Sequence, residues 1–220
     1  MKIKKILDLS QTFYHNNPGY LPYEPTSITF EKIKAKDGYT AERINMDTHT
    51  ATHIDAPQHH FPLGKDVAQI PIEQLVGEAV VVDLFDSEAH RSIGVAELEP
   101  YADKIHEGDI VLLCTGWAYK RAWTTDYVDN WPFLSAEGAD WLLAKKVKGI
   151  AIDGMSVGGP KNGEGLYPHE LLLAAEIWLG EELYLPKELL EYERWNFAFL
   201  PLKMVDCGGA PGRAIAWIEE

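Results

Sequence analysis

Short apolar runs spread along the whole chain are the feature that most restricts how this sequence can fold. Each run has four to six residues, with glycine, proline or aspartate in it or beside it. Runs of this length and setting are typical of strands buried in a sheet, because a buried helix needs a longer apolar segment. They occupy residues 79–84, 109–113, 149–153, 197–200 and 213–218.

Helical segments are expected between these runs. Ser135 is a suitable N-cap for a helix over 136–146, where apolar residues recur at helical spacing. A weaker candidate covers 92–101, and Pro168 introduces a third helix over 169–176, since proline is tolerated where a helix begins. Strands that alternate with helices predict an α/β protein.

Length and charge bound the organisation of the chain and its partners. With 220 residues, the sequence is expected to form a single domain over 1–220. It carries 20 lysines and arginines against 34 aspartates and glutamates, a formal net charge of −14. A surface this acidic repels nucleic acid and anionic membranes, so neither is expected as a partner. We expect a small-molecule substrate instead.

Cysteine content and hydropathy bear on the location of the protein. The two cysteines, Cys114 and Cys207, are too few for a disulfide framework or a cysteine-rich zinc site, which favours the reducing cytoplasm. The basic start at residues 1–5 is not followed by the apolar segment of a signal peptide. The most apolar segments are far too short to cross a bilayer. We therefore expect a soluble cytoplasmic protein.

A histidine-rich segment, residues 47–61, contains the strongest chemical signal. It holds four of the eight histidines, and the spacing H-x3-H-x-D-x3-H is formed by His49, His53, Asp55 and His59. Imidazole and carboxylate groups are ligands of zinc, manganese or iron, and ligands close in sequence assemble at a lower entropic cost. An extended chain would place His53 and Asp55 on one face, because strand side chains alternate. The alternative is a histidine-rich loop that binds no metal.

Two further features restrict this segment. Pro57 disfavours a helix at its own position and at the one before it, so the histidines are not the pair of a helical metal site. The glutamate of the H-E-x-x-H motif is also absent, which excludes a protease of the zincin type. If the segment stays extended, alternation points His60 away from the side chain of His59.

The stretch H-T-A-T-H-I-D-A-P-Q-H resembles the hallmark H-T-G-T-H-x-D-A-P-x-H of the metal-dependent cyclase and kynurenine formamidase family, with Ala51 in place of the glycine. The similarity extends over most of the chain, including T-G-W at 115–117 and the closing segment around 201–214. The resemblance implies an α/β fold with β/β/α layers, a barrel-like mixed sheet and flanking helices. It also implies assembly as a homodimer or a larger homo-oligomer.

The resemblance further implies two divalent metal ions per chain, zinc or manganese, with His59 as the general acid and base. The ligands that it implies are His49, His53, Asp55, which bridges the ions, His169 and Glu181. A straight helix would separate His169 from Glu181 by about 18 Å, too far for ligands of adjacent ions. We therefore expect the helix to stop near Ala175 and the chain to return through a strand at 177–179. Glu182 is the alternative to Glu181, and His60 is the alternative to His59 as the general acid and base, although alternation along an extended segment favours His59.

Departures from the family pattern fall in the expected substrate pocket. Kynurenine formamidases carry a W-P-G element near the N-terminus, and the tryptophan position here is Asn17. Cys114 stands where the family often has arginine, and Gly158 where it has an acidic residue. We expect Asn17 and Trp117 to contact the substrate. The aromatic residues from Trp117 to Trp131 are otherwise typical of core or subunit-interface packing.

The function implied by the resemblance is hydrolysis of a C–N bond in a small molecule. The substrate would be an amide, a formamide or a cyclic amide of the N-formylkynurenine type, as in tryptophan catabolism. A metal pair would activate water and polarise the carbonyl group, and His59 would move the proton to the leaving nitrogen. The alternatives are a lactone hydrolase, a metal-dependent lyase or isomerase of the same fold, and a metal-binding protein without catalysis.

Overall fold

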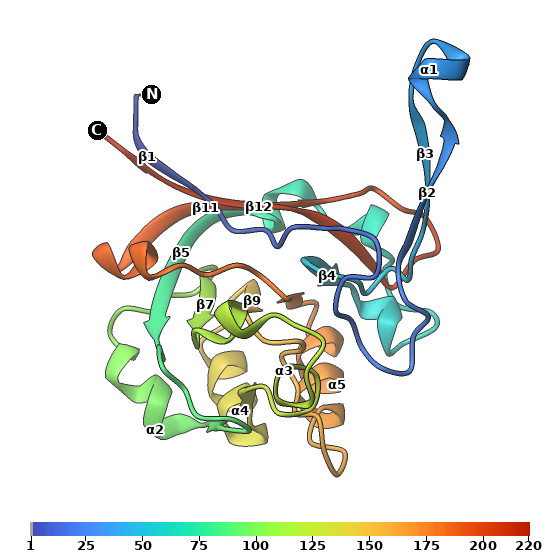
Figure 1. Cartoon of the computed structure of the whole chain (residues 1–220). Coiled ribbons are helices and arrows are strands. Elements are labelled where there is room, and N and C mark those ends of the chain that lie inside the picture. Colours follow the sequence, from blue (N-terminus) through green and yellow to red (C-terminus); the bar gives the residue numbers. More distant parts are fainter. Residues whose placement is uncertain (1) are drawn as a thin grey trace.

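The computed structural model describes residues 2–220, so the first residue of the expected domain 1–220 lies outside it (Figure 1). The strands are β1 (Ile3–Asp8), β2 (Ser27–Lys32), β3 (Ala41–Asn45), β4 (His53–Asp55), β5 (Val76–Asp83), β6 (Ser92–Ile93), β7 (Ile110–Cys114), β8 (Phe133–Leu134), β9 (Gly149–Ile152), β10 (Trp178–Glu181), β11 (Arg194–Pro201) and β12 (Gly209–Glu219). The helices are α1 (Lys34–Asp37), α2 (Val95–Leu98), α3 (Thr125–Asp129), α4 (Ala136–Ala144) and α5 (Leu166–Ala174). Across residues 2–220, no helix combines the length and apolarity that a membrane crossing requires.

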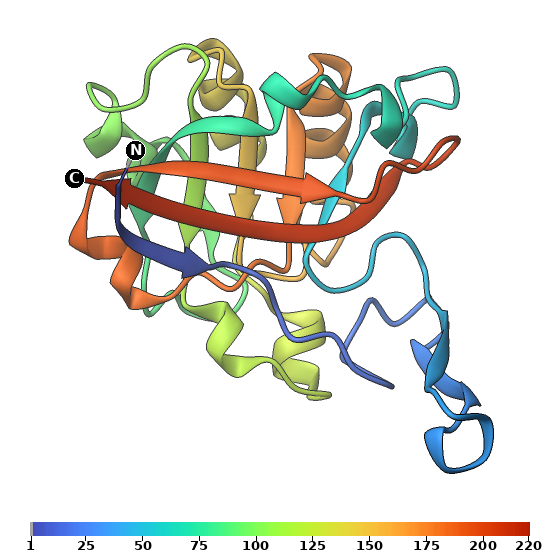
Figure 2. The ribbon, with the colours of Figure 1, turned by 90° about the horizontal axis from the view of Figure 1, so that it is seen from above.

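Seven of the described strands close into a mixed barrel. Going round it, the order is β12, β11, β5, β7, β9, β10 and β4, and β4 then pairs with β12. The strands β5, β7, β9 and β10 run parallel to one another, whereas the other pairs are antiparallel. The long strand β12 can close the ring because its first residues pair with β4 while later ones pair with β11 and β1 (Figure 2). The expected barrel-like mixed sheet is therefore confirmed.

The alternation of side chains along the barrel strands produces two apolar layers. In β5, Ala79 and Val81 belong to the layer inside the barrel, whereas Val80 and Val82 belong to the layer that meets the helices. Bulky side chains such as Trp178 fill the interior, so the barrel is a packed core rather than a channel. The helices α4 and α5 pack on each other and cover the outer layer (Figure 1).

Most of the expected elements are present. The apolar runs lie in β5, β7, β9, β11 and β12, and the helix expected over 136–146 is α4. The prediction of a helix over 92–101 is wrong at its start, because Ser92 and Ile93 form β6 and pair with β8. The helix α2 starts only after Gly94, and α5 starts at Leu166, which places Pro168 within its first turn.

The strands β2 and β3, joined through α1, form a hairpin that projects from the barrel (Figure 1). We call residues 27–45 the arm. Exposed apolar side chains on the arm are Phe30, Ile33, Tyr39 and Ile44. Because a lone two-stranded hairpin is marginally stable in water, this exposure favours packing against another surface.

Candidate metal centre

The centre of the site is the short strand β4, which lies between β10 and β12. Its register places His53 directly opposite Glu181 of β10, so both side chains project from the same face. The Nε2 atom of His53 lies 3.3 Å from Oδ1 of Asp55 and 3.5 Å from Oε2 of Glu181. The predicted placement of His53 and Asp55 on one face is therefore confirmed.

The turn before β4 orients two histidines. Ala51 in this turn has a left-handed backbone, with a φ of 54°. Its carbonyl oxygen accepts a hydrogen bond from Nδ1 of His53 at 2.7 Å, which leaves Nε2 of His53 free to face the carboxylates. His49, earlier in the turn, places its Nδ1 atom 2.6 Å from Oδ1 of Asp55.

His169 and Glu181 reach the same cluster from α5 and β10. The helix ends and the chain turns through residues 175–177 into β10, as expected. The Nε2 atom of His169 lies 3.2 Å from Oε1 of Glu181 and 3.6 Å from Oδ2 of Asp55. Nδ1 of His169 donates to the carbonyl oxygen of Gly165 at 2.7 Å, so Nε2 faces the carboxylates.

Neighbouring contacts distinguish Glu181 from Glu182. The hydroxyl of Ser156 donates to Oε1 of Glu181 at 2.7 Å, and a backbone N–H donates to the same oxygen. Glu182 instead accepts a hydrogen bond from the hydroxyl of Tyr127 at 3.1 Å and lies 3.5 Å from Nε of Arg121. Glu181 is therefore the carboxylate that faces the histidine cluster.

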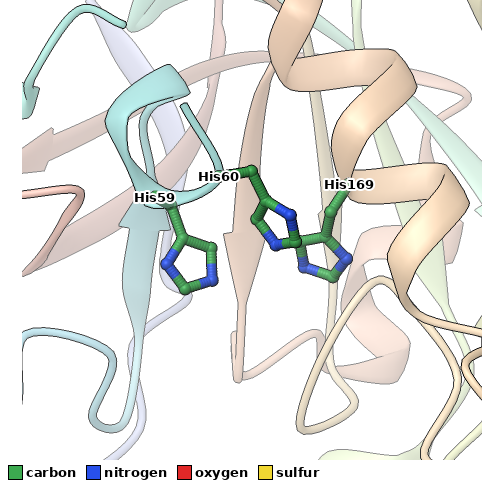
Figure 3. Close-up of side chains that lie close together, drawn as sticks. All are labelled: His59, His60 and His169. Carbon is green, nitrogen blue, oxygen red and sulfur yellow. The ribbon is translucent and has the colours of Figure 1, made fainter. Parts of the chain in front are cut away.

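Two adjacent histidines enter the cluster from the turn that follows β4. Residues 57–59 form a single 3₁₀ turn instead of an extended chain. The ring centroids of His59 and His49 lie 3.9 Å apart, and those of His60 and His169 lie 5.1 Å apart. Figure 3 shows His59 and His60 on the turn, with the ring of His60 beside that of His169. The expectation that His60 points away is wrong, because a tight turn does not alternate side chains between two faces as a strand does.

The donor set of the cluster fits divalent metal ions. His53, Asp55 and Glu181 bring ligand atoms within 4.8 Å of one another, and so do His49, Asp55 and His59. Within the described part of the chain, Nε2 of His53 and Oδ2 of Asp55 are buried without a hydrogen-bond partner. Buried polar atoms of this kind are destabilising unless something pairs with them, and a coordinated ion would do so. The individual ligand roles stay predictions.

Burial and close pairing of opposite charges shape the electrostatics of the cluster. Burial opposes ionisation of Glu181, but contacts with His169 and His53 hold the pKa of Glu181 at about 2. The carboxylates raise the pKa of His169 to about 10 against the effect of burial. The centre therefore stabilises positive charge, which a divalent ion would supply. Burial and the nearby His49 and His169 lower the pKa of His59 to about 4.

A cavity of about 340 Å³ opens onto the cluster. The histidines and Glu181 form its polar end. Its other walls include Tyr20, Tyr23, Trp131, Met155, Pro160 and Leu166. A cavity of this volume, with polar groups at one end and aromatic walls, suits a small aromatic ligand.

Neither of the predicted substrate contacts lines this cavity. Trp117 is fully buried beside Trp131, and its indole N–H donates to the carbonyl oxygen of Tyr127. Asn17 is also buried, and its side-chain amide donates to the carbonyl oxygen of Pro18. The fold therefore packs both side chains away from this cavity, and contact of either one with a substrate stays a prediction.

Sequence reasoning missed the aromatic residues that do line the cavity. Trp131 belongs to the aromatic patch visible in the sequence, but nothing in the spacing of that patch shows which of its rings lines the cavity. Tyr20 and Tyr23 lie a few residues after Asn17, so the segment indicated by the resemblance does reach the cavity, through these two tyrosines.

Two departures from the family pattern have structural explanations. The side chain of Cys114 lies in the barrel interior, and burial raises the pKa of its thiol well above the usual value, so it is not a nucleophile. Gly158 lies so close to the backbone of Gly165 and the ring of His169 that no larger side chain fits without a shift.

The chain is similar in sequence and in fold to several known proteins. The model of a family described as "Putative cyclase" matches residues 7–158. The kynurenine formamidase of Erythrobacter litoralis is 32% identical to this chain, and the alignment covers 96% of this chain and 93% of that protein. A solved structure described as a potential metal-dependent hydrolase with cyclase activity has a TM-score of 0.78 at 27% identity and covers 98% of both chains. Isatin hydrolase A from Labrenzia aggregata shares the fold, with a TM-score of 0.86, 23% identity and coverage of 98% of this chain and 94% of that one.

Proposed function

Since this chain belongs to the cyclase family and is a metal-dependent hydrolase of amide bonds, we propose that its substrate is a small aryl formamide of the N-formylkynurenine type. The observation that carries the proposal is the cluster of imidazoles and carboxylates at the end of an aromatic-lined cavity. The relatives that align over nearly the whole chain are kynurenine formamidases, which supports a formamide as the substrate. A cavity of about 340 Å³ has room for one such molecule.

We also propose that the centre holds two divalent ions, zinc or manganese. The ligands would be His49, His53, Asp55, His169 and Glu181. Asp55 suits a shared ligand, because Oδ1 faces His49 and His53 while Oδ2 faces His169. Bound ions of this type supply a water molecule of lowered pKa and polarise the substrate carbonyl.

We assign the proton transfer during hydrolysis to His59. Its ring lies against His49 and lines the cavity, and its pKa of about 4 keeps the ring neutral at neutral pH. A neutral ring nitrogen of His59 can accept the proton released by the attacking water and then donate it to the leaving nitrogen. The oxygen of that water enters the new acid, and the amine leaves with the transferred proton.

The same geometry supports a cyclic aryl amide or a lactone as an alternative substrate class. In both, the carbonyl group would occupy the same position beside the cluster, and ring opening would replace release of formate. A lyase or isomerase on this fold would differ in its product, because no solvent oxygen would be incorporated.

We further propose that the chain acts as one domain in a cytoplasmic homodimer, with the arm packed on the second copy. The arm exposes Phe30 and Ile44, and three lysines lie at residues 32–36 near its tip. This basic tip complements the acidic body of a second copy, since the whole chain has a net charge of −14. Both cysteines are free thiols, which suits a reducing compartment. Sedimentation should show a wild-type dimer and a Phe30→Asp monomer, and a wild-type monomer would contradict this assembly.

The first test of the proposed function combines metal analysis with turnover. The wild-type protein should bind about two ions per chain and release formate from N-formylkynurenine, with oxygen from heavy-oxygen water in the formate. Glu181→Gln should lose metal, whereas the matched control Glu182→Gln should keep it, because Glu182 contacts Tyr127 and Arg121 instead. His59→Ala should keep both ions and lose roughly 10²–10⁴-fold in kcat.

Each negative result rejects a different part of the proposal. If the reconstituted wild-type protein binds no metal, the centre is misassigned. Turnover of a cyclic amide or a lactone without turnover of the formamide would reject the proposed substrate. A product that lacks solvent oxygen would reject hydrolysis, and full activity in His59→Ala would remove His59 from the proton path.

A further inference from the structure

One wall of the catalytic cavity is a glycine-rich loop rather than a layer of large side chains. Residues 158–165, which we call the wall loop, read G-G-P-K-N-G-E-G. Gly159, Pro160, Gly163 and Gly165 of this loop line the cavity. Because glycine has the most conformational freedom to lose on folding, a loop of this composition needs specific contacts to keep one shape.

The two ends of the wall loop are tied to the site itself. At its start, the indole N–H of Trp131 donates to the carbonyl oxygen of Gly158 at 2.8 Å. At its end, the carbonyl oxygen of Gly165 accepts from Nδ1 of His169 at 2.7 Å. The shape of the loop therefore affects the position of Trp131, which lines the cavity, and the orientation of His169, a predicted metal ligand.

Between these ends, Glu164 holds the loop against the body of the protein. Its Oε2 atom lies 3.0 Å from Nε2 of His90 and accepts from the backbone N–H of Lys161 at 3.3 Å. The Glu164 side chain also packs across Gly159, where an added Cβ would collide with it. The ring of His90 is itself supported by Phe133, with the ring centroids 5.1 Å apart.

We propose that Glu164 and His90 are positioning residues that hold the wall loop closed on the substrate and thereby set KM. Neither residue is among the described residues that line the cavity, so their effect must pass through the loop. Without their contact, the loop would populate open shapes, and the apparent substrate affinity would fall with the fraction of closed protein. The expected effect on KM rests on the hydrolase function proposed above.

Limited trypsin digestion reports on the loop without any substrate, because Lys161 lies within it. In the closed loop, the ammonium group of Lys161 donates to Oδ1 of Asn130 at 2.6 Å. For Glu164→Ala we expect cleavage after Lys161 to accelerate at least roughly fivefold, measured by mass spectrometry of the fragments. We also expect KM to rise roughly tenfold while kcat changes by less than about twofold. His90→Phe, which keeps an aromatic ring on Phe133, should behave in the same way.

Two control variants separate this role from a general loss of structure. In Glu164→Gln, the rate of cleavage after Lys161 and the KM should both stay close to the wild-type values, because the amide oxygen can still accept hydrogen bonds from His90 and from the backbone. Tyr167→Phe should change neither readout, since it removes only the exposed hydrogen bond to Asp140 beside the loop.

The two readouts also separate this inference from the proposed function. Unchanged cleavage in Glu164→Ala would overturn the inference, whether or not any substrate is turned over. A loss in kcat at constant KM, or equal effects in Tyr167→Phe, would overturn it as well. Failure of the proposed function would appear as absent formamide turnover in the wild type, while the cleavage comparison would still decide whether Glu164 and His90 hold the loop.

Discussion

Replacing Ala51 with glycine should leave the stability of the protein nearly unchanged, although the change removes a buried methyl group. Ala51 is 3% exposed and has a φ of 54°, so its Cβ atom strains a left-handed backbone. Relief of this strain stabilises the variant by roughly 1–2 kcal/mol. Loss of the buried methyl group destabilises the variant by about 0.8 kcal/mol. The greater conformational freedom of its unfolded chain destabilises it by about a further 0.4–1 kcal/mol. These contributions nearly cancel.

Ala56→Gly is the matched control for this prediction. Ala56 is also buried, but its φ of −103° carries no strain for alanine. Its replacement should therefore cost about 1–2 kcal/mol, and the two variants should differ by a similar amount. Urea denaturation in the presence of a chelator measures both variants, because chelation removes the contribution of metal binding to stability.

Equal losses of stability in the two variants would refute the idea that position 51 stores backbone strain. Metal affinity provides a second check. The bond that orients His53 uses the main-chain carbonyl of Ala51, so Ala51→Gly should retain wild-type metal affinity. A large loss of affinity would show that the methyl group, and not the backbone alone, holds the turn.

The remaining predictions concern Asp153, Ser156 and two tryptophans. Burial raises the pKa of Asp153 to about 6 against hydrogen bonds from Thr115, so the folded protein keeps a proton that the unfolded chain releases. The free energy of unfolding should therefore fall as pH rises from about 4 to 6. Asp153→Asn should remove about 3 kcal/mol of this fall, measured by urea titrations at several pH values, and an unchanged pH dependence in the variant would contradict the prediction. Ser156→Ala, which removes the hydroxyl that supports a predicted ligand carboxylate, should weaken metal binding roughly 10–100-fold in chelator competition, and unchanged affinity would count against that support. Trp131→Phe should raise KM, whereas Trp117→Phe should lower only the stability of the protein, by about 1–3 kcal/mol; the reverse pattern would identify Trp117 as the substrate contact.

The strands and the cluster of histidines and carboxylates could be predicted because both depend on short-range patterns. The buried runs are visible as apolar residues, and the spacing of His53 and Asp55 places both on one face of an extended chain. The return of the chain from His169 to Glu181 followed from a distance argument, and β10 confirms the strand that this argument required. The alternation expected for His60 does not hold, because the extended chain gives way to a 3₁₀ turn just before it.

The side chains that line the cavity could not be predicted, because the exposure of a side chain depends on what packs beside it. Trp117 and Trp131 belong to the same aromatic patch, yet only Trp131 lines the cavity. The sequence by itself determined the α/β class, the apolar strands and the ligand chemistry of the site, since local spacing and residue type carry that information. Only the tertiary structure decided that β4 lies between β10 and β12, that His53 stands opposite Glu181, and that a glycine-rich loop forms one wall. Those contacts join segments far apart in the chain, and they depend on how the barrel closes and on the register of its strands, which no local pattern specifies.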